Sequence, residues 1–208
     1  MKNPDNETTV YVYDDIGRLI SIQDPGAGTF SFLYDDTGRR TRVTYPGGGR
    51  LDYFYDNANR LLSIQPTGIS IDPISYTYDD KGNKTSMTIV GIINTYTYDV
   101  KNQLLTEMKP GYTAIYTYDG VGNRLTSEIN GNLLTYTYDD DNKLTMINDG
   151  RVFIYDNNGN LIEQQEPGGN TIYEYDIENL LIKAFLPNND EYIYIICPLG
   201  IRIAKTSP

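Results

Sequence analysis

Closely spaced carboxylates and amides are the residues of this sequence best suited to chemistry. Aspartates stand in pairs such as Asp14-Asp15 and Asp79-Asp80, and asparagine joins them in the loop 139–142. Two carboxylates in a cleft are the requirement of glycoside hydrolysis, and oxygen-rich loops are the ligands that calcium prefers. The sequence has no histidine, the usual general base for a nucleophile such as Cys197. Carboxylate catalysis and calcium binding are therefore the chemistries to weigh.

The acidic clusters recur along the whole chain, and this recurrence argues against a special site. A glycosidase needs one distinctive carboxylate pair, whereas these aspartates occupy equivalent positions in successive copies of a motif. The loops 139–142 and 156–160 lack the EF-hand spacing and its closing glutamate. A single cysteine excludes an internal disulfide. We predict no enzyme activity, no metal site and no cofactor, and we interpret the aspartates as turn residues.

The motif has the form aromatic-x-Tyr-Asp-x-x-(Gly or Asn)-(Arg, Lys or Asn), and it occurs ten times. Successive copies start 17 to 23 residues apart, and a fixed period of this size indicates a repeat architecture. In the last copy, Ile196 and Cys197 replace the second aromatic residue and the aspartate. The two aromatic columns contain Tyr11, Tyr13, Phe32, Tyr34, Tyr53, Tyr55, Tyr76, Tyr78, Tyr96, Tyr98, Tyr116, Tyr118, Tyr136, Tyr138, Phe153, Tyr155, Tyr173, Tyr175 and Tyr194.

A turn follows each aromatic pair. Glycine and asparagine adopt positive φ most readily, so their column predicts a left-handed residue in every copy. An aspartate side chain can accept a hydrogen bond from a backbone N–H two residues on, which favours a type I turn before that residue. The predicted turn residues are Asp14, Gly17, Asp35, Gly38, Asp56, Asn59, Asp79, Gly82, Asp99, Asn102, Asp119, Gly122, Asp139, Asn142, Asp156, Gly159, Asp176, Asn179 and Gly200.

Short strands must flank these turns. Segments such as 96–98 alternate aromatic and β-branched residues with period two, and segments such as 60–64 form a second strand after the turn. Pro-Gly and Asn-Gly breakers then lead to the next copy. We predict an all-β fold, an antiparallel meander of about ten two-stranded repeats in one array over 1–208. Its repeats run from about 9 to 205, the last copy, 192–205, is degenerate, and so long a sheet must curl or spiral.

The motif resembles the YD repeat, or Rhs repeat, and the segment 116–125 matches the family form closely. The family includes Rhs toxins, wall-associated toxins, toxin-complex C subunits and teneurins. The resemblance implies a β-strip that spirals into a hollow shell, which encloses a C-terminal effector in the toxins. The sequence departs from the family in being short and in carrying Cys197-Pro198-Leu199-Gly200 where an Asp-Pro-Leu-Gly segment is common. We interpret this segment as a drifted tenth repeat, and the chain as a fragment, a decayed copy or a short self-associating version.

Each aromatic pair points to one face of the predicted sheet, and the residue between its members points to the other. We expect the rings to stack from repeat to repeat as a ladder, each offset neighbour adding about 0.5–1.5 kcal/mol. The alternative is that rows of exposed tyrosine beside Asp and Asn bind carbohydrate. No copy differs from its siblings as a binding site would, which favours the ladder.

Composition limits the function further. A net charge of −11 argues against nucleic acid and anionic membranes as partners. The unpaired edges expected at 8–13 and 192–196 favour pairing with another chain. We therefore predict a non-enzymatic structural protein, the wall of an Rhs-type shell or a self-assembling scaffold or filament subunit, with a carbohydrate-binding or adhesion module as the alternative. Its expected partners are copies of itself or flanking repeats of a longer chain, and an enclosed toxin domain in the shell version. We expect an extracellular or cell-surface location, with the export signal outside this sequence.

Overall fold

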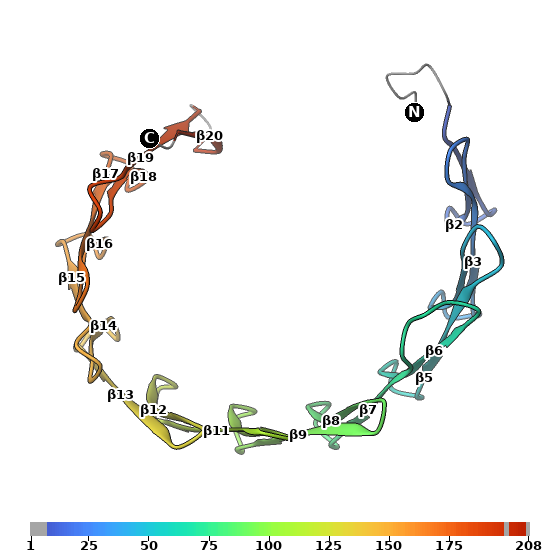
Figure 1. The fold of residues 1–208 in the computed structure, drawn as a ribbon, viewed down its shortest axis with the longest axis horizontal. Coiled ribbons are helices and arrows are strands. Elements are labelled where there is room, and N and C mark those ends of the chain that lie inside the picture. Colours follow the sequence, from blue (N-terminus) through green and yellow to red (C-terminus); the bar gives the residue numbers. More distant parts are fainter. Residues whose placement is uncertain (1–7, 198–199, 207–208) are drawn as a thin grey trace. The chain divides into compact units, whose positions relative to one another are not determined.

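The computed structural model describes residues 8–197 and 200–206, and it is all-β (Figure 1). Twenty strands and no helix are found among these residues, so the prediction of an antiparallel meander of about twenty short strands is confirmed. The chain divides into two compact units, Met1–Tyr112 and Thr113–Pro208. The prediction of one continuous array over 1–208 stays a prediction.

Strands of the first unit lie in chain order. They are β1 (Val10–Tyr13), β2 (Leu19–Asp24), β3 (Gly28–Tyr34), β4 (Arg40–Thr44), β5 (Arg50–Tyr55), β6 (Leu61–Thr67), β7 (Ile74–Tyr78), β8 (Lys84–Ile89), β9 (Ile92–Tyr98) and β10 (Leu104–Lys109). Each pairs antiparallel with the next.

The second unit repeats this plan, with β11 starting at the boundary. Its strands are β11 (Tyr112–Tyr118), β12 (Arg124–Ile129), β13 (Asn132–Tyr138), β14 (Leu144–Ile147), β15 (Val152–Tyr155), β16 (Leu161–Glu166), β17 (Gly169–Tyr175), β18 (Leu181–Phe185), β19 (Glu191–Ile196) and β20 (Arg202–Thr206). These strands also pair antiparallel with their sequence neighbours.

Two kinds of turn connect the strands. The motif turn is the loop that begins at the aspartate of each copy, and the far turn leads to the next copy. A β-bulge accompanies each motif turn: Val12 pairs with Ser21, but Tyr13 pairs with Leu19, which leaves one extra residue on β2. The same shift recurs beside the other motif turns, for example between Phe54 and Tyr55. Bulges increase the local twist of a strand pair, so every repeat twists at the same place.

Most of the buried residues lie beside the first aromatic column. Val43, Ile147 and Ala184 are at most 6% exposed, and each stands directly opposite the first aromatic residue of its hairpin, as in the pair Phe32 and Val43. Ser127 occupies the same position opposite Tyr116 and is also buried. Each unit is a one-layer strip, so this row and the rings that cover it take the place of a core between two layers.

The two faces of the strip therefore differ. The tyrosine face carries the aromatic columns, most of whose rings are half-buried, and the opposite face carries the mostly exposed residue between them, such as Leu33, Phe54 or Thr77. This alternation follows from the period of two along a strand. In the described residues we find no helix long and apolar enough to cross a membrane.

Candidate functional site

The motif turn is the feature that every repeat shares, and its backbone geometry is uniform. In the first copy, the Asp14 N–H donates to the carbonyl of Arg18 (2.9 Å), and the Gly17 N–H donates to the carbonyl of Asp14 (3.0 Å). The residues of the Gly/Asn column all have positive φ, between 60° and 109°: Gly17, Gly38, Asn59, Gly82, Asn102, Gly122, Asn142, Gly159, Asn179 and Gly200. This geometry is a type I turn closed by a left-handed residue.

The tenth copy keeps the same backbone pattern although its aspartate is replaced. The Cys197 N–H donates to the carbonyl of Ile201, and the Gly200 N–H donates to the carbonyl of Cys197, both at 2.9 Å. Cys197 is a free, half-buried thiol. The two residues between them, Pro198 and Leu199, lie outside the described residues.

In most copies both oxygens of the motif aspartate are occupied. Asp35 Oδ1 accepts from the N–H groups of Thr37 (3.0 Å) and Arg39 (2.9 Å), and Asp35 Oδ2 accepts from Arg39 Nε at 2.6 Å. Asn83, Asn123 and Asn160 take the arginine's place in other copies, each donating an amide N–H to its aspartate at 2.9 Å. These carboxylates therefore serve their own turns.

The electrostatics agree with this role. Partial desolvation alone would raise the pKa of Asp35, but the hydrogen bonds from Arg39 and Thr37 outweigh it and lower that pKa to about 2. In Asp14 the hydrogen bond from the Arg18 side chain is the largest influence and lowers the pKa. The same kinds of hydrogen bond lower the pKa of other motif aspartates, namely Asp56, Asp79, Asp119, Asp139 and Asp156. A general acid needs a raised pKa instead.

The residue four positions after each aspartate links one repeat to the next. Arg39 Nη1 donates to the carbonyl of Asp56 in the following motif turn at 3.0 Å, and Arg18 and Arg60 make the equivalent bond at 3.1 and 2.7 Å. Asn83 reaches the next turn differently, through Asn102 Oδ1 at 2.9 Å. These bonds run from turn to turn along one edge of each unit, and we call them the turn clamp.

Tyrosines of the second aromatic column complete the clamp. The Tyr55 ring lies under the Arg39 guanidinium, 4.9 Å from its centroid, and the Tyr55 hydroxyl donates to the carbonyl of Arg40 at 3.0 Å. The hydroxyls of five further column members reach the preceding repeat in the same way, at 2.8–3.0 Å: Tyr34, Tyr78, Tyr98, Tyr138 and Tyr155. Each of these tyrosines is thus held by the repeat before it.

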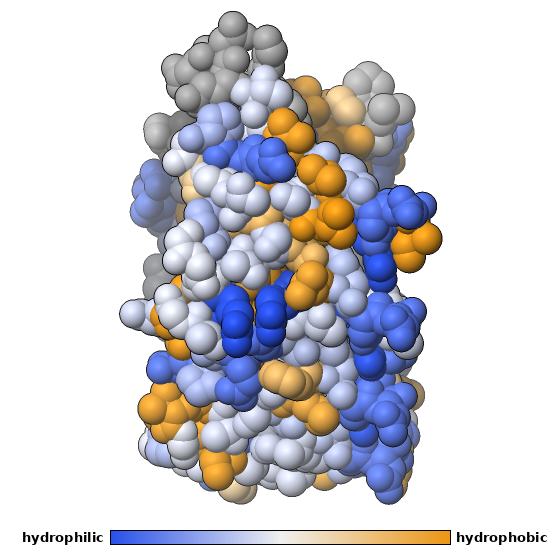
Figure 2. Space-filling model, turned by 90° about the vertical axis from the view of Figure 1, so that its right-hand side faces the viewer, coloured by the Kyte–Doolittle hydropathy of each residue, from blue (hydrophilic) through white to orange (hydrophobic). Residues whose placement is uncertain are grey.

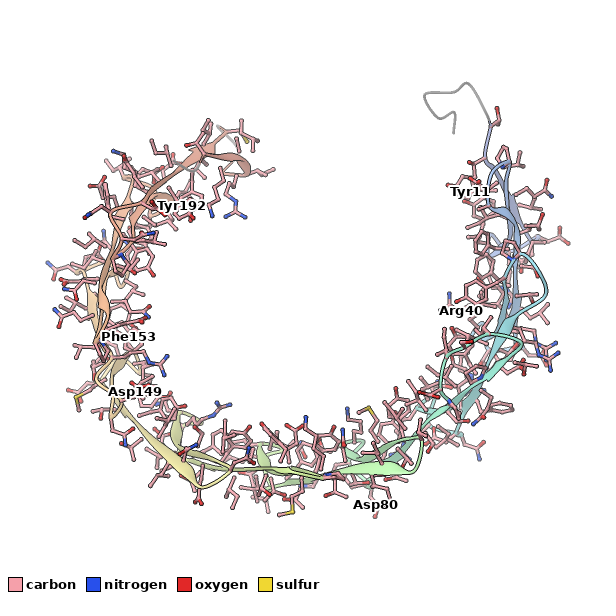
Figure 3. The ribbon with its side chains drawn as sticks, viewed as in Figure 1. Tyr11, Arg40, Asp80, Asp149, Phe153 and Tyr192 are labelled. Carbon is pink, nitrogen blue, oxygen red and sulfur yellow. The ribbon has the colours of Figure 1, made fainter. Side chains whose placement is uncertain are left out.

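Rings of the first aromatic column also meet cations or hydroxyls. Arg40 lies over Tyr53 at 5.2 Å, Arg124 lies over Tyr116 at 4.7 Å, and Tyr136 shares a hydrogen bond with Ser127 (2.9 Å). Figure 3 shows Tyr11 and Arg40 on the same side of the first unit's ribbon. Among the described residues, the ring–ring contact joins Phe30 and Tyr45, which lie outside both columns. Stacking between column rings stays a prediction, while cation–π contacts and hydroxyl bonds are observed.

Sequence reasoning did not assign the clamp to its donors. In the motif these donors appear only as its last position, which is occupied by Arg18, Arg39, Arg60, Asn83 and Asn123. The signal that identifies them is the spacing of four residues from the aspartate, which places the side chain back over the turn. Within 8–197 and 200–206, no group of three or more acidic or cysteine residues is arranged to hold a metal ion.

Two family models match successive parts of the chain. The RHS Repeat model matches residues 13–50 and 34–69, and the Teneurin YD-shell model matches residues 70–196. A search of curated proteins found no match.

Solved structures share the fold at low sequence identity. A TcdB2-TccC3-Cdc42 crystal structure is 17% identical with a TM-score of 0.69 over 96% of this chain. A Tc holotoxin pore of Photorhabdus luminescens is 18% identical with a TM-score of 0.71 over 95% of this chain. The chain spans 12% and 13% of the length of those two chains.

Proposed function

The chain belongs to the Teneurin YD-shell family, and from this membership we propose that it is a stretch of shell wall whose task is structural. The turn clamp is the observation that carries the proposal. It joins neighbouring repeats by bonds such as Arg39 to Asp56 and Tyr55 to Arg40. Its groups hold the strip together, as a wall requires.

The tyrosine contacts favour the wall over the carbohydrate-binding alternative. A sugar ring stacks on an exposed aromatic face and bonds to free polar groups. The faces of Tyr34, Tyr55 and Tyr78 lie under guanidiniums at 4.9–5.1 Å. Their hydroxyls donate to backbone carbonyls of the preceding repeat. The ring faces and hydroxyls of these tyrosines are therefore occupied by contacts within the strip.

The wall is extended through the strand edges. β1 pairs with β2 and β20 pairs with β19, so each unit ends in an edge strand. Edge strands present unpaired backbone groups to another chain. We propose that further repeats pair there, from a longer chain or from copies of this one, and that the completed wall encloses a toxin domain outside the cell.

Lysine substitutions on β1 test the extension. Val10→Lys with Val12→Lys places charge on the edge strand, which blunts strand addition. The matched control, Val100→Lys with Val121→Lys, adds the same charge at exposed turn residues. Light scattering over a concentration series, with negative-stain microscopy, should show assemblies for the native chain and the control and smaller particles for the β1 variant. A native chain that stays monomeric throughout would contradict edge pairing between copies and leave extension by a longer chain as the proposal.

A further inference from the structure

An arginine–aspartate–arginine cluster stands on the opposite face of β3, β4 and β5. Arg42 Nε donates to Asp52 Oδ1 at 2.5 Å, and Arg50 Nε donates to Asp52 Oδ2 at 2.9 Å. The Asp52 side chain is 14% exposed, while those of Arg42 and Arg50 are 37% and 42% exposed. The two guanidiniums therefore cover the carboxylate and form the surface.

This cluster has one positive charge in excess, because two guanidiniums share one carboxylate. Burial alone would raise the pKa of Asp52, but hydrogen bonds from both arginines outweigh it, so the pKa is lowered and the carboxylate stays ionised. Among the described residues, no hydrogen bond uses the terminal nitrogens of either guanidinium. Those nitrogens can bind a second carboxylate in the bidentate manner typical of arginine.

Apolar side chains flank the cluster. Leu33 and Phe54 are 53% and 52% exposed, and together with the arginines they line a hollow of ≈ 480 Å³. Figure 2 views the side of the first unit that carries β2 to β6, and it shows hydrophobic groups beside strongly hydrophilic ones on this surface. A ligand that fits this site combines a carboxylate with an adjacent aliphatic group.

The motif turn 176–179 of the chain itself offers that combination. Ile177 is 99% exposed at the turn, and Glu178 follows it, also exposed. A net charge of −11 makes copies of the chain repel each other over most of their surfaces. The excess positive charge of the arginine cluster can instead attract an acidic turn of another copy.

We propose that the hollow on β3–β5 binds the turn 176–179 of a second copy of this chain. The Ile177 side chain packs between Leu33 and Phe54, and the Glu178 carboxylate bonds to the free nitrogens of Arg42 and Arg50. The contact joins a face to a turn. It is therefore lateral, independent of the edge pairing proposed above, and it brings strips side by side.

Directed cross-linking tests the contact. In a Cys197→Ser background, a Phe54→Cys chain is mixed with an Ile177→Cys chain under mild oxidation, and crossed disulfide dimers are quantified. The matched control replaces Ile177→Cys by Val100→Cys, which occupies the same turn position and is 85% exposed but precedes Lys101 rather than a glutamate. We expect crossed dimers with Ile177→Cys and few with Val100→Cys. Equal yields from the two turns, or none, would overturn the proposal.

Removing the charge gives a second readout. Arg42→Gln with Arg50→Gln should lower the yield of crossed dimers about tenfold or more, because charge pairs of this kind set the register of an interface. Circular dichroism melting confirms that the variant is folded, and Arg124→Gln on β12 is the control for loss of a guanidinium elsewhere. An unchanged yield in the folded double variant would refute the role of the cluster. The lysine substitutions on β1 should leave the yield unaltered, which separates this contact from edge assembly.

Discussion

Val90 provides a direct test of the backbone geometry, because a β-branched residue stands where the turn requires asparagine or glycine. The far turn between β8 and β9 has φ values of 50° at Val90 and 75° at Gly91. The turn between β12 and β13 has the same form, with 50° at Asn130 and 83° at Gly131. Both are two-residue hairpin turns with positive φ at each central position, for which Asn-Gly is preferred. Val90→Asn should therefore stabilise the chain.

The magnitude follows from the surroundings of the two turns. A non-glycine residue in the left-handed region costs about 1–2 kcal/mol, and asparagine tolerates it best. Val90 is 64% exposed, so little apolar burial is lost on replacement. Asn130 Oδ1 also accepts from the Thr113 N–H at 2.8 Å, but the corresponding neighbour of Val90 is Pro73, which has no N–H. Val90→Asn should thus gain about 1 kcal/mol from conformation alone.

The reverse substitution is the matched control. Asn130→Val loses both the conformational preference and the hydrogen bond to Thr113, so it should cost about 2 kcal/mol. Urea unfolding followed by circular dichroism measures both changes, and in thermal melts 1 kcal/mol corresponds to about 2–4 °C for a chain of this size. A Val90→Asn variant no more stable than the native chain would refute the reasoning, because the cost would then not lie in the φ angle.

Three further predictions concern the motif turn and the clamp. Tyr78→Phe removes the 2.8 Å bond to the carbonyl of Leu61 and should cost about 1 kcal/mol in unfolding experiments, whereas Tyr13→Phe, at a ring that is 56% exposed, should cost almost nothing. Gly122→Val forces valine to a φ of 109° and should cost more than about 1 kcal/mol of stability, whereas Gly120→Ala in the same turn should be near-neutral. An unchanged melting temperature of the Gly122→Val variant would contradict the turn assignment. The pKa of Asp35 is about 2 in the folded state and near 4 in the unfolded state. The contribution of Asp35 to the free energy of unfolding is therefore complete above pH ~4 and is lost as pH falls towards 2. Acid titration of the melting temperature should show this loss and a shallower slope in Asp35→Asn, and equal slopes would count against the turn carboxylate as its source.

The repeat determined how much of the fold was predictable. Strand segments and turn positions follow from local chemistry, since Asp14 and Gly17 sit three residues apart in one loop. The bulge beside Tyr13 could not be predicted, because it depends on which residue of β2 faces Val12. The alternation of residues in β1 and β2 does not mark where the extra residue stands.

The clamp and the arginine cluster could not be predicted from the sequence, for a related reason. Arg18 and Tyr34 meet at 5.0 Å although sixteen positions separate them, so their contact depends on how successive repeats are placed. Arg42, Arg50 and Asp52 lie outside the repeating columns. No periodicity marks them, and only the pairing of Arg42 with Asp52 across β4 and β5 brings them together.

The turn clamp also has a consequence for how the chain acquires its structure. Its bonds join residues close in sequence, such as Tyr34 to Leu19, fifteen positions apart, and Arg18 to Asp35, seventeen apart. Short sequence separation favours rapid folding, and arrays of this kind gain stability one neighbour at a time. Each tyrosine hydroxyl of the clamp also finds its acceptor in the repeat synthesised before it. The strip can therefore form progressively as the chain leaves the ribosome, each finished hairpin serving as the template for the next.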